Sequence, residues 1–205
     1  HYSVPAGIGT DGLDDPPSWD AVTNPKGRDV VDQPLIFSLE PGKFGGTVSW
    51  LAADGLDAEQ TDAIAAARAV ELLEGCARDR RRFFLAVGFY RPHTPYVAPK
   101  GWFDRHPLDS VTLPAVPADH DAGVPRAAVA SRKPEQDRLV GDLGRQALQA
   151  YRASVSFVDA QVGKVLDAVE RIGLGDDTIV VFTSDHGYHL GDHGLWQKMS
   201  LFEAS

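Results

Sequence analysis

The sequence contains little cysteine or methionine and no long apolar run. Its 205 residues include one cysteine, Cys76, and one methionine, Met199. A single cysteine excludes an internal disulfide and leaves the redox compartment undecided, and its place in a predicted helix indicates a half-buried thiol. No run approaches the roughly 18 to 20 apolar residues that cross a bilayer, and no signal-peptide pattern opens the chain. Because the chain begins at His1, we expect it to be a piece of a longer protein.

Positive charge is also scarce. The formal net charge of -9 argues against a nucleic-acid binder, which usually carries a basic patch. Hydrophobic residues make up 43% of the chain, which is sufficient to build a core. The length suits one domain or a large piece of one. We therefore predict a single partial domain, 1–205, that binds neither nucleic acid nor membrane.

Two stretches show no sustained periodicity. Residues 1–55 are rich in Gly, Pro and Asp, and we expect loops there with short strands near 35–39 and 47–51. Residues 104–144 are rich in Pro, Ala and Asp and are predicted to form a surface insertion or lid. Substrate specificity would lie in these irregular regions.

The segment 56–103 predicts a helix followed by a buried strand. Asp57 suits an N-cap and Gln60 stands in the capping-box position, so a helix is expected up to about Arg80. The apolar run 83–89, "FFLAVGF", is typical of a buried parallel strand. The prolines of the following "YRPHTPYVAPKGWF" predict irregular structure. The expected buried stripe of the helix comprises Ile64, Ala67, Val70, Leu73 and Ala77.

The segment 145–205 repeats this order. A helix is predicted from about Arg145 to Ile172, with Gly173 as its C-terminal stop, and 176–184, "DDTIVVFTS", as the next strand. Alternation of helices and apolar strands predicts an α/β fold with a mostly parallel sheet flanked by helices.

Both predicted strands end in polar loops that carry histidine. "RPHTP" contains His93, and "SDHGYHLGDHG" opens with Asp185 and His186. Ligands of α/β sheets gather beyond the carboxyl ends of the strands, so these residues are predicted to share one rim. A carboxylate and an imidazole there can bind a divalent cation; the alternative is an Asx-turn with a surface histidine.

Three further polar residues follow in the second loop. The second loop carries four side chains of the types that bind zinc: His186, His189, Asp192 and His193. Glycines between them interrupt the spacing that a zinc-binding helix would have. We therefore expect His189 and His193 to orient other ligands or to face solvent. Lys198 could hold an anionic group as a point charge, or could be solvated.

Taken in order, "FFLAVGFYRPHTPYVAPKGWF", "YRASVSFVDAQVGKVLDAVE" and "TIVVFTSDHGYHLGDHGLWQKMSLFE" resemble the sulfatase family, most closely its iduronate-2-sulfatase-like branch. The resemblance implies an alkaline-phosphatase-like α/β sandwich that hydrolyses sulfate esters of a small molecule or glycan. It implies that Asp185 and His186 are ligands of Ca²⁺, in preference to Zn²⁺ or Mn²⁺. It also implies that His93 and Lys198 contact the sulfate and that one of them protonates the departing alcohol.

The sequence departs from the family pattern in two places. The family's nucleophile is a formylglycine made within a [CS]-x-[PA]-x-R motif, which is absent from the 205 residues, as is the early strand with paired aspartates. We therefore expect a sulfatase segment without turnover of its own. The alternatives are a zinc- or manganese-dependent phosphoesterase of the same superfamily and a non-catalytic binding fragment. A sheet without a central neighbour exposes unpaired backbone, so homo-oligomerisation or further sequence is expected to cover it.

Overall fold

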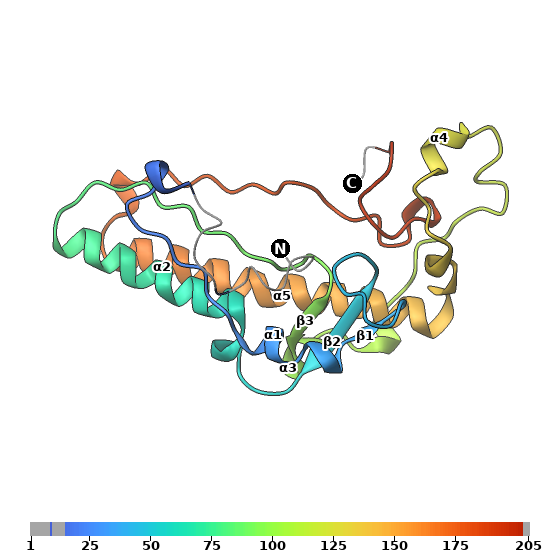
Figure 1. The fold of residues 1–205 in the computed structure, drawn as a ribbon, viewed down its shortest axis with the longest axis horizontal. Coiled ribbons are helices and arrows are strands. Elements are labelled where there is room, and N and C mark those ends of the chain that lie inside the picture. The colour runs from blue at the N-terminus through green and yellow to red at the C-terminus, as the bar shows by residue number, and fades with distance from the viewer. Residues whose placement is uncertain (1–8, 10–14, 203–205) are drawn as a thin grey trace.

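A pair of packed helices forms the long axis of the molecule. The computed structural model describes residue 9 and residues 15–202 (Figure 1). Helix α2 (Thr61–Arg78) lies against helix α5 (Gly141–Arg171), and no helix in the described part of the chain is long and apolar enough to cross a membrane. The remaining α-helices are short: α1 (Arg28–Val31), α3 (Lys100–Asp104) and α4 (Arg126–Val129).

A small mixed sheet packs against α5. Its strands are β1 (Phe37–Ser38), β2 (Ser49–Ala53) and β3 (Tyr96–Pro99), in the order β1-β2-β3. β1 and β2 are antiparallel, whereas β2 and β3 are parallel, with Trp50 opposite Tyr96. The fold is therefore mixed α/β as predicted, and one of the two strand pairings in the described sheet is parallel.

The strand β3 lies where prolines predicted irregular structure, so that prediction is wrong. Pro95 precedes the strand and Pro99 ends it, and β3 is an edge strand that pairs only with β2 among the described strands. A proline can occupy such a position because the outer side of an edge strand needs no ladder donor. The strand residues Tyr96, Val97 and Ala98 are fully buried. Their burial favours the strand more than the flanking prolines disfavour it.

The two longer apolar runs, 83–89 and 176–184, were predicted as buried strands and are not strands. Both are extended without strand pairing, and Phe84, Ile179 and Val181 are 84%, 92% and 82% exposed. A strand needs a neighbour to satisfy its backbone N–H and C=O groups. Within residues 15–202, no segment supplies that neighbour. Figure 1 shows both runs as long connections beside the α2–α5 pair.

The two long helices lie where the periodicity predicts them, but the start of α2 differs from the prediction. α2 begins at Thr61, after a 3-10 turn at Asp57–Glu59 in which the Leu56 N–H donates to Glu59 Oε2 at 2.6 Å. Asp57, predicted as the N-cap, instead accepts a hydrogen bond from Trp102 Nε1 at 2.8 Å. Gly173 has φ +75° just beyond α5, as its predicted role as a stop requires.

The core lies between the two long helices and the sheet. The buried face of α2 is formed by Ala63, Ala66, Ala69 and Leu73, so most of its stripe is displaced from the prediction. Small side chains let helix axes approach closely, and Ala63 of α2 belongs to the same buried cluster as Ala147, Ala150 and Ala153 of α5. Cys76, on α2, is half-buried as predicted.

Candidate functional site

The loop that carries His93 is anchored at its base by a buried charge network. The carboxylate of Asp62, on α2, accepts hydrogen bonds from the backbone N–H groups of Tyr90 and Arg91, each at 2.9 Å. The Arg91 guanidinium donates to Asp29 at 2.8 Å and to the Val97 carbonyl at 2.7 Å. Because Asp29, Asp62 and Arg91 are all buried, the loop leaves the core at a defined point.

Thr94 fastens the other end of this loop to β2. Its hydroxyl donates to the Thr47 carbonyl at 2.9 Å and accepts from the Ser49 N–H at 3.2 Å. Next to it, His93 Nδ1 lies 2.6 Å from the Thr94 carbonyl oxygen. A carbonyl oxygen only accepts, so Nδ1 carries the proton and Nε2 points away from the backbone. Burial lowers the pKa of His93, which favours the neutral ring.

The second loop brings His186 and Lys198 to the same place. The His93 and His186 rings are 5.8 Å apart between centroids. Lys198 Nζ lies 3.5 Å from His93 Nε2 and also contacts His186 Nε2. Asp185 is at the solvent side, with an 87% exposed side chain and Oδ2 3.6 Å from His186 Nε2. The structure therefore places all four predicted site residues together, although Lys198 and His93 are far apart in sequence.

This cluster has the chemistry to receive an oxyanion. The Lys198 ammonium has three donors and no acceptor, and the two imidazoles face it with their Nε2 atoms. An anion that enters can take hydrogen bonds from the ammonium and displace it from the rings. The half-buried position of His93 and Lys198 strengthens such an interaction relative to open water.

Tyr188 is a site residue that the sequence analysis did not identify. Its hydroxyl accepts a hydrogen bond from the Thr94 N–H at 3.4 Å, and burial raises its pKa to about 12. Its ring therefore joins the two loops as a neutral phenol. The available signal was an aromatic residue directly after Asp185-His186-Gly187. The ring centroid lies 5.9 Å from His93, 5.6 Å from His186, 5.9 Å from Tyr96 and 6.1 Å from Tyr151.

His189 and His193 lie elsewhere on the second loop. His189 is 4% exposed, with Nε2 2.6 Å from Ser200 Oγ, so it does not face solvent. His193 Nδ1 lies 3.2 Å from His120 Nε2, and its ring stacks on Phe202 at 4.2 Å. These contacts hold the loop together and direct neither ring to the His93–His186–Lys198 cluster.

The described residues do not form a complete metal site. No group of three or more His, Cys, Asp or Glu side chains in this part of the chain is placed to hold an ion. Asp185 and His186 offer one carboxylate and one imidazole, whereas calcium takes about six to eight oxygen ligands. The Lys198 ammonium also contacts the imidazole nitrogen that a cation would use.

Comparison with known proteins gives consistent matches. A family model described as sulfatase matches residues 14–203. Iduronate 2-sulfatase from Homo sapiens is 38% identical over 152 residues, which cover 67% of this chain and 28% of that protein. Choline-sulfatase from Rhizobium meliloti (strain 1021) is 35% identical over 129 residues, which cover 62% of this chain and 25% of that protein.

A solved structure also aligns with the chain. The crystal structure of the sulfatase yidJ from Bacteroides fragilis has a TM-score of 0.49 and 29% identity, over 68% of this chain and 28% of that one. The chain thus spans little more than a quarter of the length of the curated relatives that it matches.

Proposed function

Since the chain belongs to the sulfatase family, we propose that it carries the sulfate-contacting part of a sulfuric ester hydrolase with a partial alkaline-phosphatase-like sandwich fold. The observation that supports this most directly is the meeting of His93 and Lys198, whose Nε2 and Nζ atoms are 3.5 Å apart although they come from different loops. The substrate would be a sulfate ester of a small molecule or of a glycan.

In this proposal, the positive charge of Lys198 stabilises negative charge that shifts among the sulfate oxygens as the S–O bond breaks. The hydrogen bond from His93 Nδ1 to the Thr94 carbonyl aims Nε2 into the cluster. Lys198, or His93 once its Nε2 has taken up a proton, then protonates the bridging oxygen of the departing alcohol, provided that it lies within hydrogen-bond reach. Tyr188 keeps the two loops at the separation that an anion needs.

Members of the sulfatase family generally use a divalent metal. We infer that Asp185 and His186 are two ligands of such an ion, Ca²⁺ by the family resemblance. Their remaining partners would lie outside the described residues, because two ligands do not complete a calcium shell. The bound ion would supply a further fixed positive charge beside the sulfate.

Sulfate binding by the 205-residue chain tests this proposal without requiring turnover. We expect isothermal titration calorimetry to detect sulfate binding and Lys198→Met to weaken it about tenfold, the loss of about 1.4 kcal/mol. Lys43→Met is the matched control, because Lys43 is an exposed lysine paired with Glu40 on the β1–β2 connection. Equal sulfate affinity of the wild type and Lys198→Met would contradict the proposal.

A chromogenic aryl sulfate provides the second measurement. The 205 residues contain no [CS]-x-[PA]-x-R motif, so we expect this chain to bind the ester without hydrolysing it. Hydrolysis that persists through purification would show that the site carries its own nucleophile. Inorganic phosphate in the same titration separates the phosphoesterase alternative, for which phosphate would bind more tightly than sulfate.

A further inference from the structure

Two histidines outside the proposed sulfate site meet where the insertion contacts the loop that carries Lys198. His120 belongs to the insertion, residues 104–144, and His193 belongs to the turn at residues 191–196. His120 Nε2 lies 3.2 Å from His193 Nδ1, and the ring centroids are 4.9 Å apart. Two nitrogen ligands of one tetrahedral zinc ion, each at about 2.0–2.1 Å from the metal, are about 3.3 Å apart. The two imidazoles therefore already stand at nearly the separation that a shared ion requires.

The surroundings of His193 direct its Nδ1 atom to His120. The His193 ring stacks on Phe202 with a centroid distance of 4.2 Å, which fixes the ring plane. Asp192 Oδ2 lies 3.7 Å from Nε2, the other ring nitrogen. A carboxylate beside Nε2 favours the tautomer with its proton on that nitrogen, which leaves the Nδ1 lone pair facing His120. Histidines that bind metals commonly have a carboxylate in this position.

One guanidinium group holds the segments that carry the two histidines. The terminal nitrogens of Arg132 donate to the Asp121 carboxylate at 2.9 and 3.2 Å, and one of them also donates to the His193 carbonyl at 3.3 Å. Because Asp121 follows His120 in the chain, Arg132 contacts the neighbour of one ring and the backbone of the other. The spacing of the two imidazoles is therefore set by the protein before an ion binds.

A cation can reach the pair from solvent. The His193 side chain is 34% exposed, and His120 lines a cavity of about 400 Å³ between the insertion and the turn. Among the described residues no third His, Cys, Asp or Glu is placed to bind the same ion, so water from the cavity would complete its shell. Imidazole suits Zn²⁺, Cu²⁺ and Ni²⁺, whereas Ca²⁺ prefers oxygen ligands.

We propose that His120 and His193 chelate a transition-metal ion of the Zn²⁺, Cu²⁺ or Ni²⁺ class, at a place different from the Asp185–His186 pair. Without the ion, one ring donates its N–H to the facing nitrogen of the other. When the ion binds, the donating ring carries its proton on its other nitrogen. Both facing nitrogens then offer a lone pair, and neither imidazole changes its charge.

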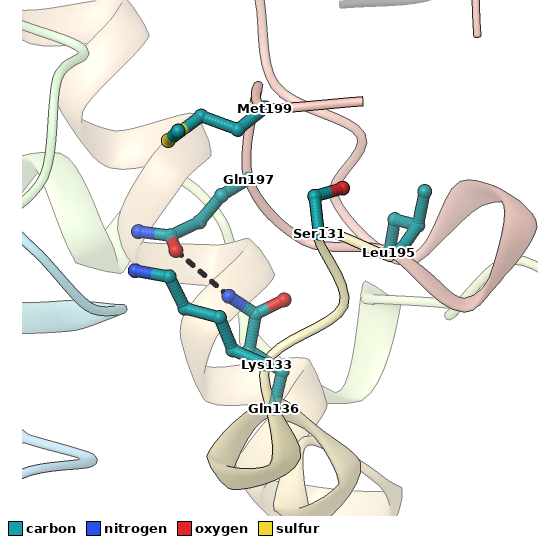
Figure 2. Close-up of a pocket in the computed structure, with 6 residues that line it drawn as sticks. All are labelled: Ser131, Lys133, Gln136, Leu195, Gln197 and Met199. Atoms are coloured by element: carbon teal, nitrogen blue, oxygen red, sulfur yellow. Dashed lines mark hydrogen bonds between the residues drawn. The ribbon is translucent and has the colours of Figure 1, made fainter. Parts of the chain in front are cut away.

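The ion would fasten the insertion to the loop at a further point. The insertion already meets this loop where the buried Gln136 donates to Gln197 Oε1 at 2.8 Å, a contact that Figure 2 shows beside Lys133 and Met199. With both points closed, the insertion has less freedom to open away from the turn. We therefore expect Zn²⁺ to slow backbone hydrogen exchange of residues 113–131 in the wild type.

Calorimetric titration with zinc chloride and nickel chloride, in a buffer that does not bind metals, tests the site on the 205-residue chain. We expect a saturable binding event that His120→Ala and His193→Ala each weaken at least about tenfold. His120→Gln keeps a side chain that can hydrogen-bond to His193 but lacks the imidazole ligand, so it should lose metal binding while the fold is kept. Excess Ca²⁺ should leave the zinc affinity unchanged. Circular dichroism shows whether each variant is folded.

His106→Ala is the matched control, because it also removes one of the seven histidines. His106 Nε2 lies 2.8 Å from Ser156 Oγ rather than facing a second imidazole, so this variant should keep the wild-type zinc affinity. Absence of saturable binding by the wild type, or equal zinc affinity of the wild type and folded His120→Gln, overturns the metal site. Displacement of zinc by Ca²⁺ also overturns it, as does hydrogen exchange of residues 113–131 that zinc leaves unchanged.

Discussion

Tyr188 illustrates how one side chain can organise a site without carrying its charge. Its ring lies edge-on to His93 and His186, and its hydroxyl meets the backbone N–H of Thr94. The two loops also meet where His93 approaches His186 and Lys198, and the phenol adds a contact to the backbone of the first loop. At the residue scale, its two functions can be separated by substitution.

Tyr188→Phe keeps the ring contacts and removes only the hydroxyl that accepts from Thr94. We expect unfolding free energy to fall by about 0.5–1.5 kcal/mol, with sulfate affinity nearly unchanged. Tyr188→Ala also removes the ring that contacts both imidazoles, so stability should fall by about 2–4 kcal/mol and sulfate affinity with it. Urea unfolding and sulfate titration of both variants measure this. Equal sulfate affinity of the Phe and Ala variants would exclude a positioning role for the ring.

Asp62 anchors the start of the His93 loop through the backbone N–H groups of Tyr90 and Arg91. Burial raises its pKa, an effect partly offset by Arg91 and by the backbone N–H groups of Tyr90 and Arg91. Asp62→Asn replaces one of two acceptor oxygens by an NH₂ group, which would face a backbone donor. We expect a loss of about 2–3 kcal/mol in unfolding free energy.

The pH dependence of the Asp62→Asn effect has a definite sign. Because the folded pKa is raised, the folded protein holds this proton to higher pH than the unfolded chain. The contribution of the carboxyl group is therefore greatest below its unfolded pKa of about 4 and decreases as pH rises through the folded value. The difference in unfolding free energy between wild type and Asp62→Asn should therefore decrease as pH rises from the unfolded pKa to the folded pKa of Asp62. Urea midpoints between about pH 4 and 7 measure it, and a widening difference would contradict the expected sign.

At the scale of elements, the insertion holds the 191–196 turn by close packing. Gly191 has φ +100°, and a Cβ there would lie 3.2 Å from Pro114 Cδ. Gly191→Ala should therefore cost about 1–3 kcal/mol from the backbone conformation alone, with an additional cost from the contact. Displacement of the turn should also weaken sulfate binding through Lys198.

Gly123→Ala is the matched control for this variant. Gly123 has φ +82°, and a Cβ there would meet nothing within 4 Å. It shares the backbone penalty of Gly191→Ala without the contact to Pro114. Thermal unfolding and sulfate titration of the two variants isolate the packing effect. Equal losses of stability and unchanged sulfate affinity in both would show that the insertion does not position the turn.

The elements also differ in how well they could be predicted. α2 and α5 follow from periodicity, and Gly173 ends α5 as expected, because helix hydrogen bonds and caps are local. β3 was missed, since its edge position and burial depend on β2 and α5 rather than on its own residues. Asp57 was misassigned as the N-cap for the same reason. Its carboxylate accepts a hydrogen bond from Trp102, which is 45 positions away in sequence.

For the whole molecule, the exposed runs 83–89 and 178–183 form the most conspicuous apolar surface. Ile179 is 92% exposed, and Val181 and Phe182 are 82% and 81% exposed. Contiguous exposed apolar groups with unpaired backbone promote association. We expect the 205-residue chain to self-associate as its concentration rises.

Substitution of Ile179 and Val181 by lysine tests this expectation. The double variant should increase the monomer fraction in size-exclusion chromatography with light scattering and should reduce binding of the dye ANS. The control is the substitution of Val31 and Leu35 by lysine. These two side chains are 69% and 65% exposed but lie outside the extended runs. A monomeric wild type, or an equal effect of the control, would show that the extended runs do not drive association.

The sequence alone determined the two long helices, the family and the identity of His93, Asp185, His186 and Lys198 as candidates, because local periodicity and contiguous motifs encode them. Only the tertiary structure decided that Lys198 Nζ faces both imidazoles, that Tyr188 joins the loops, and that the apolar runs pair with no strand among residues 15–202. The physical reason is the range of the interactions. A helix satisfies its backbone within its own segment, whereas strand pairing and side-chain clusters require groups that packing brings from distant parts of the chain.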